Sequence, residues 1–413
     1  MENIPKGPLW VIVNELSNQD LMNLCLTNKR YYNLLCNNKQ FWFWRIYKRF
    51  GDIKIPDSLR KDCLNNPKCI WDIFTMSTLY MFGGNTWGQL GTGEYGLNMK
   101  KFTPTNIKSG IRYVSCAKSH TGTITTDNKL FMFGHNHYGQ LGIKDKGYKS
   151  VPTKVMNNVR YVSCGGYLTG VITTDNKLLM FGCNDYGQLG MGDTQNRLVP
   201  TNIMNNIRYV SCGGYHTGVI TTDNKLFMLG YNEYGQLGTG DEQNRSTLTN
   251  VMSNIRYVSC GTFHTGIIST DDKLFMFGNN RYGQLGIGDI QNRLMPTHVM
   301  NNVRYVSCGL FHTGVITTDN KLIMFGRNDY GQLGIGDKSD TTNVMDNIRY
   351  VSCGGEHTGV ITIDNKLFMF GWNKDGQLGK TSEKNTPIEI MKNIKKNIKY
   401  VSCGKNYTGI ISE

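Results

Sequence analysis

Most of the chain is a succession of short apolar runs separated by glycines and by Asp-Asn pairs. In one representative stretch the runs are Arg208–Cys212, His216–Thr222, Leu226–Leu229 and Thr249–Met252. Asp223-Asn224 joins the second run to the third, and these residue types tolerate the positive φ that two-residue hairpins require. Because β-branched and aromatic residues dominate the runs, they favour strands over helices. The stretch therefore predicts four antiparallel strands.

The same stretch recurs along the chain, marked by two four-residue motifs that each occur seven times. Tyr-Val-Ser-Cys begins at Tyr113, Tyr161, Tyr209, Tyr257, Tyr305, Tyr350 and Tyr400. Gly-Gln-Leu-Gly begins at Gly88, Gly139, Gly187, Gly235, Gly283, Gly331 and Gly376. Successive Tyr-Val-Ser-Cys motifs are 48, 48, 48, 48, 45 and 50 residues apart. Four-stranded repeats of this length are typical of propeller blades, so we predict a mainly β fold, a seven-bladed β-propeller, over residues 77–413.

The order of the pieces predicts how this ring closes. The first repeat begins with a third strand, Leu79–Phe82, and lacks the two strands before it. The last repeat ends with a first strand, Lys399–Cys403, and a second, Tyr407–Ser412. We expect residues 79–107 to pair with residues 398–413 in one blade, because this pairing leaves no open sheet edge.

Residues 1–50 differ, since their apolar side chains follow a helical spacing. The positions that define this spacing, together with the proline before them, are Pro5, Leu9, Ile12, Leu16, Leu21 and Leu24. The spacing resembles an F-box, and the resemblance implies a small α-helical domain that uses these residues to bind the small adaptor protein of a cullin ubiquitin ligase. The alternative is a three-helix cap that packs on the propeller and binds nothing. We expect residues 51–76 to form a helical connector.

The repeat also resembles a known family. Its Phe-Gly-x-Asn-x-x-Gly-Gln-Leu-Gly motif, preceded by Cys-Gly-x-x-His-Thr-Gly, resembles the regulator of chromosome condensation (RCC1-type) repeat over about residues 77–413. The pattern departs at Leu168 and Tyr407, which replace the repeated histidine, and at Asp375. The resemblance implies a propeller and, as one alternative function, guanine-nucleotide exchange on a Ran-like GTPase. Exchange in that family resembles wedging by an inserted loop, for which the even repeat spacing leaves no room.

Charge leaves two interpretations open. The formal net charge is +14 and the pI about 9.1, which raises the odds of an acidic partner such as nucleic acid or chromatin. The alternative is a surface simply coated with lysine. One basic residue precedes each Tyr-Val-Ser-Cys motif, and these either contact nucleic acid or serve blade packing: Arg112, Arg160, Arg208, Arg256, Arg304, Arg349 and Lys399.

Candidate catalytic and metal-binding groups are part of the repeat. The chain has twelve cysteines without a Cys-x-x-Cys pair, which we interpret as buried thiols in a reducing compartment. The recurring histidines (His120, His216, His264, His312 and His357) lie one to a blade, too far apart to share one metal, so we expect each to fix its blade by a hydrogen bond. We therefore expect no catalytic residue, metal or cofactor. Without a signal peptide or membrane span, we expect an intracellular monomer, nuclear or cytoplasmic, with no membrane partner.

Positions that vary between repeats are free to recognise a partner. One such position follows the glycine at the end of each third strand, and five of its residues are our candidate partner-binding set: His135, Tyr231, Asn279, Arg327 and Trp372. Tyr, Trp and Arg are common anchors of protein interfaces, although neutral drift explains such variation equally well. We expect a non-enzymatic interaction adaptor, the substrate-recruiting subunit of a cullin-type ubiquitin ligase, that binds an unknown target on the propeller face. An exchange factor or chromatin-binding protein is the alternative.

Overall fold

A computed structural model describes residues 77–336, 343–381, 384–391 and 397–412, together with the single residues Leu35 and Phe41. The chain divides into two compact units, residues 1–76 with Glu413 and residues 77–412. The helical module expected over residues 1–50 and the connector over 51–76 lie outside the described residues, apart from Leu35 and Phe41, which are both buried. In the part of the chain that the structure describes, no helix has the length and hydropathy needed to cross a membrane.

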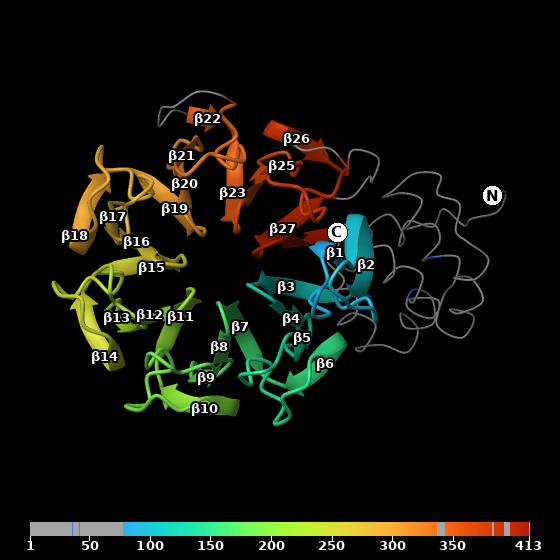
Figure 1. The fold of residues 1–413 in the computed structure, drawn as a ribbon, viewed down its shortest axis with the longest axis horizontal. Helices are drawn as coiled ribbons and strands as arrows, with labels where there is room; N and C mark the ends of the chain where they lie inside the picture. Colours follow the sequence, from blue (N-terminus) through green and yellow to red (C-terminus); the bar gives the residue numbers. More distant parts are fainter. Residues whose placement is uncertain are drawn as a thin grey trace. The chain divides into compact units, whose positions relative to one another are not determined.

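Residues 77–412 form seven four-stranded antiparallel sheets arranged as the blades of a ring, which confirms the predicted seven-bladed propeller (Figure 1). The innermost strands are β3 (Ile111–Cys116), β7 (Val159–Cys164), β11 (Ile207–Cys212), β15 (Ile255–Cys260), β19 (Val303–Cys308), β23 (Ile348–Cys353) and β27 (Ile398–Cys403). The second strands are β4 (His120–Thr125), β8 (Leu168–Thr173), β12 (His216–Thr221), β16 (His264–Ser269), β20 (His312–Thr317), β24 (His357–Thr362) and β28 (Tyr407–Ser412).

The third strands are β5 (Leu130–Gly134), β9 (Leu178–Gly182), β13 (Leu226–Gly230), β17 (Leu274–Gly278), β21 (Leu322–Gly326), β25 (Leu367–Gly371) and β1 (Thr78–Gly84). The outer strands are β6 (Lys149–Met156), β10 (Arg197–Met204), β14 (Arg245–Met252), β18 (Arg293–Met300), β22 (Asn343–Met345), β26 (Lys384–Ile390) and β2 (Lys100–Ser109). The outer strand of the representative repeat is longer than the sequence predicted. It begins at Arg245, because Gly230 pairs with Arg245 beyond an irregularity in the register.

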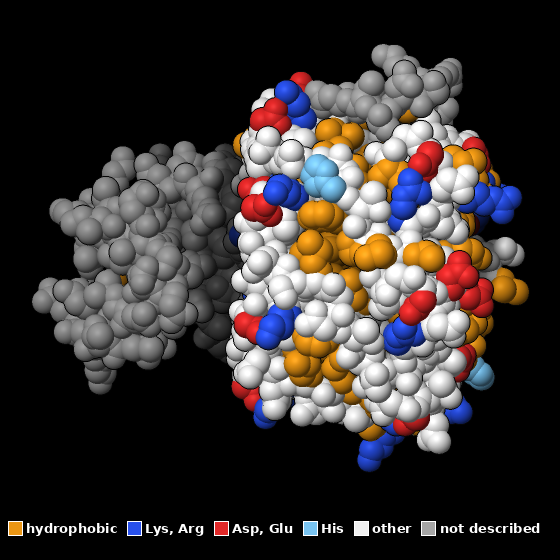
Figure 2. All heavy atoms as spheres, turned by 90° about the vertical axis from the view of Figure 1, so that its left-hand side faces the viewer, with side chains coloured by type: hydrophobic (Ala, Val, Ile, Leu, Met, Phe, Trp, Pro, Cys, Tyr) orange, Lys and Arg blue, Asp and Glu red, His pale blue; other side chains and the backbone are white. Residues whose placement is uncertain are grey.

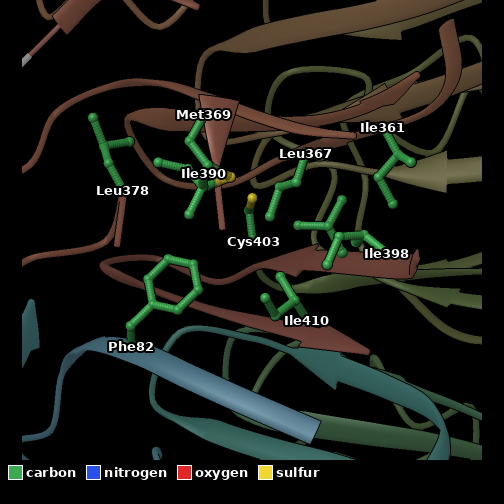
Figure 3. Packing of buried hydrophobic residues seen from close by; sticks show 10 residues of the cluster. Phe82, Ile361, Leu367, Met369, Leu378, Ile390, Ile398, Cys403 and Ile410 are labelled. Atoms are coloured by element: carbon green, nitrogen blue, oxygen red, sulfur yellow. The ribbon is translucent and has the colours of Figure 1, made fainter. Parts of the chain in front are cut away.

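Each hydrophobic core lies between two blades. In one such core, Leu367 and Met369 of β25 meet Ile398 and Cys403 of β27 and Ile410 of β28, which belong to the next blade (Figure 3). The second strands are buried on both faces, since a blade covers each side of them. The tight contact also explains a repeated glycine in these strands: a Cβ on Gly218 would lie only 2.8 Å from the Val258 side chain of the next blade.

The two ends of the propeller segment meet in one sheet, with the strand order β2-β1-β28-β27. Leu79 pairs with Ile411 and Met81 with Gly409, both antiparallel. In Figure 1 the blue β1 and the red β27 accordingly lie in the same blade. This blade combines strands from opposite ends of residues 77–412, as the order of the sequence pieces predicts.

Repeated polar side chains join each blade to the next. The serine of every Tyr-Val-Ser-Cys motif accepts a hydrogen bond from the cysteine N–H of a neighbouring blade at 2.8–2.9 Å, as in the Cys260 to Ser211 pair. The repeated histidines also act between blades, whereas we expected each to fix its own blade. His216 Nε2 lies 2.9 Å from Thr265 Oγ1 in the next blade, and the other four repeat this contact at 2.9–3.0 Å.

The threonine partner determines the histidine tautomer. Thr265 Oγ1 donates its hydrogen to the Gln236 carbonyl at 2.8 Å, so it accepts from His216 Nε2–H. Nδ1 is then the unprotonated nitrogen, and it is buried without a partner in all five histidines. Burial lowers the pKa of His216 to about 3. At neutral pH these rings are therefore uncharged donors that hold adjacent blades together.

Two blades depart from this arrangement. Leu168 packs into an apolar cluster in place of the imidazole. Tyr407 is fully buried, and its hydroxyl donates to the His120 carbonyl at 2.6 Å and contacts Thr121 Oγ1 at 3.1 Å. The tyrosine thus still joins its blade to the next one, whereas Leu168 replaces the polar contact by apolar packing.

We predict that His264→Leu removes about one fifth of the pH dependence of stability that the five buried histidines contribute. The pKa of the five histidines is about 3 to about 4 in the folded protein, against about 6.5 unfolded. Their contribution is complete above pH 6.5 and is lost on acidification, because the unfolded chain binds up to five more protons. The free energy of unfolding then falls by up to about 7 kcal/mol per pH unit. Urea unfolding at several pH values between 6.5 and 4.5 measures this slope.

Leucine is the suitable replacement because Leu168 already occupies the equivalent position in another blade. The control is His298→Leu, on the exposed side of β18, where His298 contacts Asn301. It should leave the slope unchanged. An unchanged slope for His264→Leu would contradict the assignment of a neutral, buried imidazole.

Candidate functional site

The variable positions of each blade are brought together in pairs at one end of the second and third strands. The residue after each third strand donates its backbone N–H to the carbonyl of the residue before the repeated histidine position, at 2.8–3.0 Å in all seven blades. Examples are the bonds from Tyr231 to Tyr215, from Arg327 to Phe311 and from Trp372 to Glu356. Antiparallel pairing thus makes neighbours of two variable positions that lie 16 residues apart in the chain.

Aromatic rings of these and neighbouring positions contact one another in groups, and we call the surface that they form the aromatic face. Tyr215 stacks with Phe263 at a centroid distance of 6.3 Å, and Phe263 stacks with Phe311 at 6.2 Å. Further members come from the variable positions and from the residue before each Gly-Gln-Leu-Gly turn: His135, Tyr138, Tyr167, Tyr186, Tyr231, Tyr234, Tyr282, Tyr330 and Trp372. Such a grouping of half-exposed rings is rare on an isolated soluble protein.

The five candidate residues divide into two kinds. Tyr231 and Trp372 present partly exposed rings, and Trp372 lies 4.3 Å from Tyr330. Arg327 lies 5.4 Å from the centroids of both Tyr282 and Tyr330, and its guanidinium forms ion pairs with Asp329 at 2.6 Å and Glu356 at 3.4 Å. All three side chains are partly exposed on the aromatic face.

His135 and Asn279 are tied to their own blades instead. The Gln140 side-chain nitrogen lies 2.7 Å from His135 Nδ1. Gln284 donates to the Asn279 side-chain oxygen at 2.7 Å, and Asn279 is only 8% exposed. His135 is half-buried and still offers a ring edge to the aromatic face, whereas Asn279 mainly supports the turn beneath it.

A cavity of about 330 Å³ lies where the aromatic face surrounds the propeller axis. Its wall consists of the Cys-Gly segments that end the innermost strands, and its mouth carries Lys118, Tyr215, Phe263, Leu310 and Lys405. Lys118 and Lys405 come from adjacent blades, since the Lys405 N–H donates to the carbonyl of the residue before Lys118, at 2.9 Å. The mouth is therefore cationic on one side and apolar on the other.

The groups around the cavity suit binding better than catalysis. Burial raises the pKa of the Cys212 and Cys308 thiols, which line the cavity, to about 12, so they stay protonated at neutral pH and are poor nucleophiles. The repeated histidines are neutral and donate to threonine. No group of three or more His, Cys, Asp or Glu within the described residues is placed to hold a metal ion. What this mouth offers a ligand is two ammonium groups, aromatic surface and apolar surface.

Sequence reasoning missed two parts of this site. The residue before each Gly-Gln-Leu-Gly is repeated, which suggests a structural role, yet Tyr186 and Tyr282 are each 37% exposed and join the aromatic face. Lys118 and Lys405 occupy a position that is glycine in three other blades, so its variation was a usable signal. Only the closed ring shows that Lys118 and Lys405 are neighbours.

The outer side of the blades has a different character. Figure 2 shows the side over β14 and β18, where Lys and Arg side chains lie beside Asp and Glu rather than in one basic patch. Arg245 pairs with Asp241 and Arg293 with Asp289, both at 2.5 Å. On this side of the propeller, these arginines are thus paired with nearby carboxylates.

Comparisons with known proteins give relatives of two kinds. The X-linked retinitis pigmentosa GTPase regulator of Canis lupus familiaris is 38% identical over 77 residues, which are 18% of this chain and 7% of that protein. The human protein named probable E3 ubiquitin-protein ligase HERC6 is 35% identical over 69 residues, 16% of this chain and 7% of that protein. The match thus spans about 7% of the length of these curated relatives.

Among solved structures, human WBSCR16 is 21% identical with a TM-score of 0.72 and covers 82% of this chain and 99% of its own. Prp20p of Saccharomyces cerevisiae is 17% identical with a TM-score of 0.74 and covers 82% of this chain and 91% of its own. At these identities the likeness concerns the fold.

The Regulator of chromosome condensation (RCC1) repeat matches the chain seven times, once for each of the seven repeat units. The matched segments are residues 77–124, 127–172, 175–220, 223–268, 271–316, 319–361 and 364–411. They account for most of the chain and for all of the propeller's blades. The chain belongs to the regulator of chromosome condensation repeat family.

Proposed function

We propose that this protein is a non-enzymatic interaction adaptor that binds a target protein through the aromatic face and the cavity at its centre. The observation that carries the proposal is the pairing of variable side chains on an otherwise repeated scaffold. Residues shared by all blades hold the ring together, whereas those that differ lie side by side at one end of it.

The chemistry of this surface indicates the kind of target segment it accepts. Half-exposed Tyr and Trp rings bury large areas at a small entropic cost, which is why they dominate the energetics of protein interfaces. Lys118 and Lys405 add positive charge at the cavity mouth opposite Phe263 and Leu310. A segment with an acidic side chain next to an aromatic or aliphatic one matches this division.

The proposed role for the N-terminal segment is attachment to a cullin ubiquitin ligase through its small adaptor protein. Its support is the F-box-like spacing of residues 1–50, which include Leu9, Ile12 and Leu16. Over 69 residues this chain is also 35% identical to the human protein named as a probable ubiquitin ligase. The propeller would then recruit the substrate of that ligase.

Regulation of a GTPase or binding to chromatin is the second candidate. One relative is named a GTPase regulator, and the Prp20p structure is described together with the binding of Prp20p to Gsp1p and histones. A nucleotide-release assay with a Ran-like GTPase distinguishes the two roles. Acceleration at catalytic concentrations of this protein favours the exchange factor, and the adaptor role predicts none.

For adaptor binding, we predict that Leu16→Asp and Leu21→Asp each abolish binding of the small cullin adaptor while the propeller stays folded. A charge without a partner in an apolar interface costs several kcal/mol. Isothermal titration calorimetry with the full chain measures the binding, and far-ultraviolet circular dichroism checks the fold. Leu97→Asp, at a residue that is 88% exposed in the propeller, is the matched control. Absence of binding by the unmodified chain at micromolar concentration would favour the cap interpretation.

For the aromatic face, we predict that the full chain selects peptides carrying both an acidic and an aromatic or aliphatic residue from a displayed random library. Trp372→Ala should weaken binding of a selected peptide by about 30-fold, typical of an interface anchor. Its free energy of unfolding should change by less than about 1 kcal/mol, because one exposed ring contact is lost.

The control for this experiment is Met295→Ala, on the outer strand β18, where the side chain is 64% exposed. It should leave peptide binding within two-fold. Equal effects of Trp372→Ala and Met295→Ala, or selected peptides without acidic residues, would contradict the proposed recognition.

A further inference from the structure

The opposite end of the innermost strands carries a ring of basic side chains at a backbone bulge. In β11, Ile207 pairs with Thr221 and Tyr209 with Ile220, so Arg208 is the extra residue of the bulge. The same irregularity occurs in all seven innermost strands. Because a bulge redirects the side chain that it carries, each blade places one basic residue here. The residues of this basic ring are Arg112, Arg160, Arg208, Arg256, Arg304, Arg349 and Lys399.

Each arginine of the basic ring reaches to the next blade. Its Nη2 donates to the backbone carbonyl of the first residue of the neighbouring innermost strand, as from Arg208 to Ile255 at 3.0 Å. The six arginines make this bond at 2.7–3.0 Å. The guanidinium groups are therefore fixed in a ring and are not free surface side chains.

These bonds leave some N–H donors of the guanidinium groups without a hydrogen bond to the described residues. Four arginines donate only through Nη2, so Nη1 makes no hydrogen bond to the described residues: Arg112, Arg160, Arg208 and Arg349. All four remain at least partly exposed. A fixed guanidinium with unused donors is pre-organised to bind the oxygens of an anion such as phosphate.

The arginines of the basic ring also repel one another. Burial, followed by repulsion from Arg160, lowers the pKa of Arg112. Burial, followed by repulsion from Arg256 and Arg349, has the same effect on the pKa of Arg304. Among the six arginines of the ring, Arg256 is the one with an ion pair to the described residues, with Asp272 at 2.8 Å.

The aspartates in the hairpins between the second and third strands already form ion pairs with lysines. The first residue of each two-residue hairpin is an aspartate that binds the lysine two positions later, as Asp223 does with Lys225 at 2.9 Å. The six pairs have distances of 2.6–2.9 Å. The basic ring therefore keeps its charge, and exposed aspartates surround it.

A layer of tyrosines surrounds the propeller axis, one residue after each member of the basic ring in the sequence. Rings of neighbouring blades, beginning with Tyr113 and Tyr161, have centroids 4.8–5.0 Å apart all the way round. Hydroxyl-to-hydroxyl hydrogen bonds of 2.8–3.1 Å join six of the seven pairs. A ligand held by the basic ring would rest on this hydroxyl layer.

We propose that the basic ring binds a compact polyanion that carries several phosphate groups around a small ring, with inositol hexakisphosphate as the probe. The guanidinium groups follow one another from blade to blade around the axis, which matches phosphates distributed around one small ring. The ion pairs around the ring, such as Asp175 with Lys177 and Asp223 with Lys225, offer no net positive charge to an extended duplex, whose phosphates would pass over them. The blade-to-blade bonds use Nη2, so binding through Nη1 leaves them in place.

The test is isothermal titration of the full chain with inositol hexakisphosphate at low salt, with inositol and inorganic phosphate as comparisons. One molecule should bind per chain at micromolar concentration, inositol should not bind, and inorganic phosphate should bind at least 100-fold more weakly. Binding of several molecules per chain without a defined stoichiometry would overturn the proposal.

Two triple variants remove the same charge from different places. Arg160→Gln, Arg208→Gln and Arg349→Gln together should weaken binding at least ten-fold. Arg197→Gln, Arg245→Gln and Arg293→Gln together, in the outer-strand ion pairs, should leave it within two-fold. Equal weakening by both would assign the effect to net charge and overturn the proposal.

The triple variant of Arg160, Arg208 and Arg349 also loses three blade-to-blade bonds and could misfold for that reason. A second, milder variant therefore tests the same site. The single change Arg208→Gln, which removes one such bond, should weaken binding at least three-fold while circular dichroism stays unchanged. A competing 20-base-pair DNA duplex should not displace the probe at equal phosphate concentration. An unchanged affinity of Arg208→Gln, or displacement by the duplex, would overturn the proposal, and displacement would assign the ring to nucleic acid.

Discussion

The rest of the structure depends on the burial of each second strand between two neighbouring blades. A single four-stranded blade cannot hide both faces of a strand such as β12, whose six residues are all buried. The apolar side chains reach their partners only across the boundary between blades, so the ring must close. Pairing of β1 with β28 supplies the last boundary, and it uses backbone hydrogen bonds rather than a special side chain.

Polar contacts between blades follow the same geometry. The serine bond occurs at all seven boundaries and the histidine bond at five, with Tyr407 and Leu168 in the remaining two. The buried imidazoles have a cost, since each leaves one nitrogen without a partner. They also make the propeller sensitive to acid, because folding must keep these rings neutral below their ordinary pKa.

Repetition also separates the two ends of the axis chemically. One end carries side chains that differ from blade to blade. The cavity at this end has Lys118 and Lys405 on one side and Phe263 on the opposite side. The other end carries nearly identical arginines on identical bulges, and so has close to seven-fold symmetry. A protein segment without symmetry suits the first end, whereas a small radial polyanion suits the second.

The sequence by itself determined the repeat length, the number of blades and the strand order at the closing blade, because these follow from local periodicity and from turn residues such as Asn224 (φ 64°). It also separated repeated from variable positions. Only the tertiary structure decided what each position touches. His216 serves the next blade rather than its own, Asn279 is buried beneath the face it was expected to form, and the repeated Tyr186 joins that face. Asn279 is held by Gln284 of its own blade. The contacts of His216 and Tyr186 instead cross blade boundaries between residues 49 and 45 positions apart, so they depend on the angle at which blades pack, which no local pattern encodes.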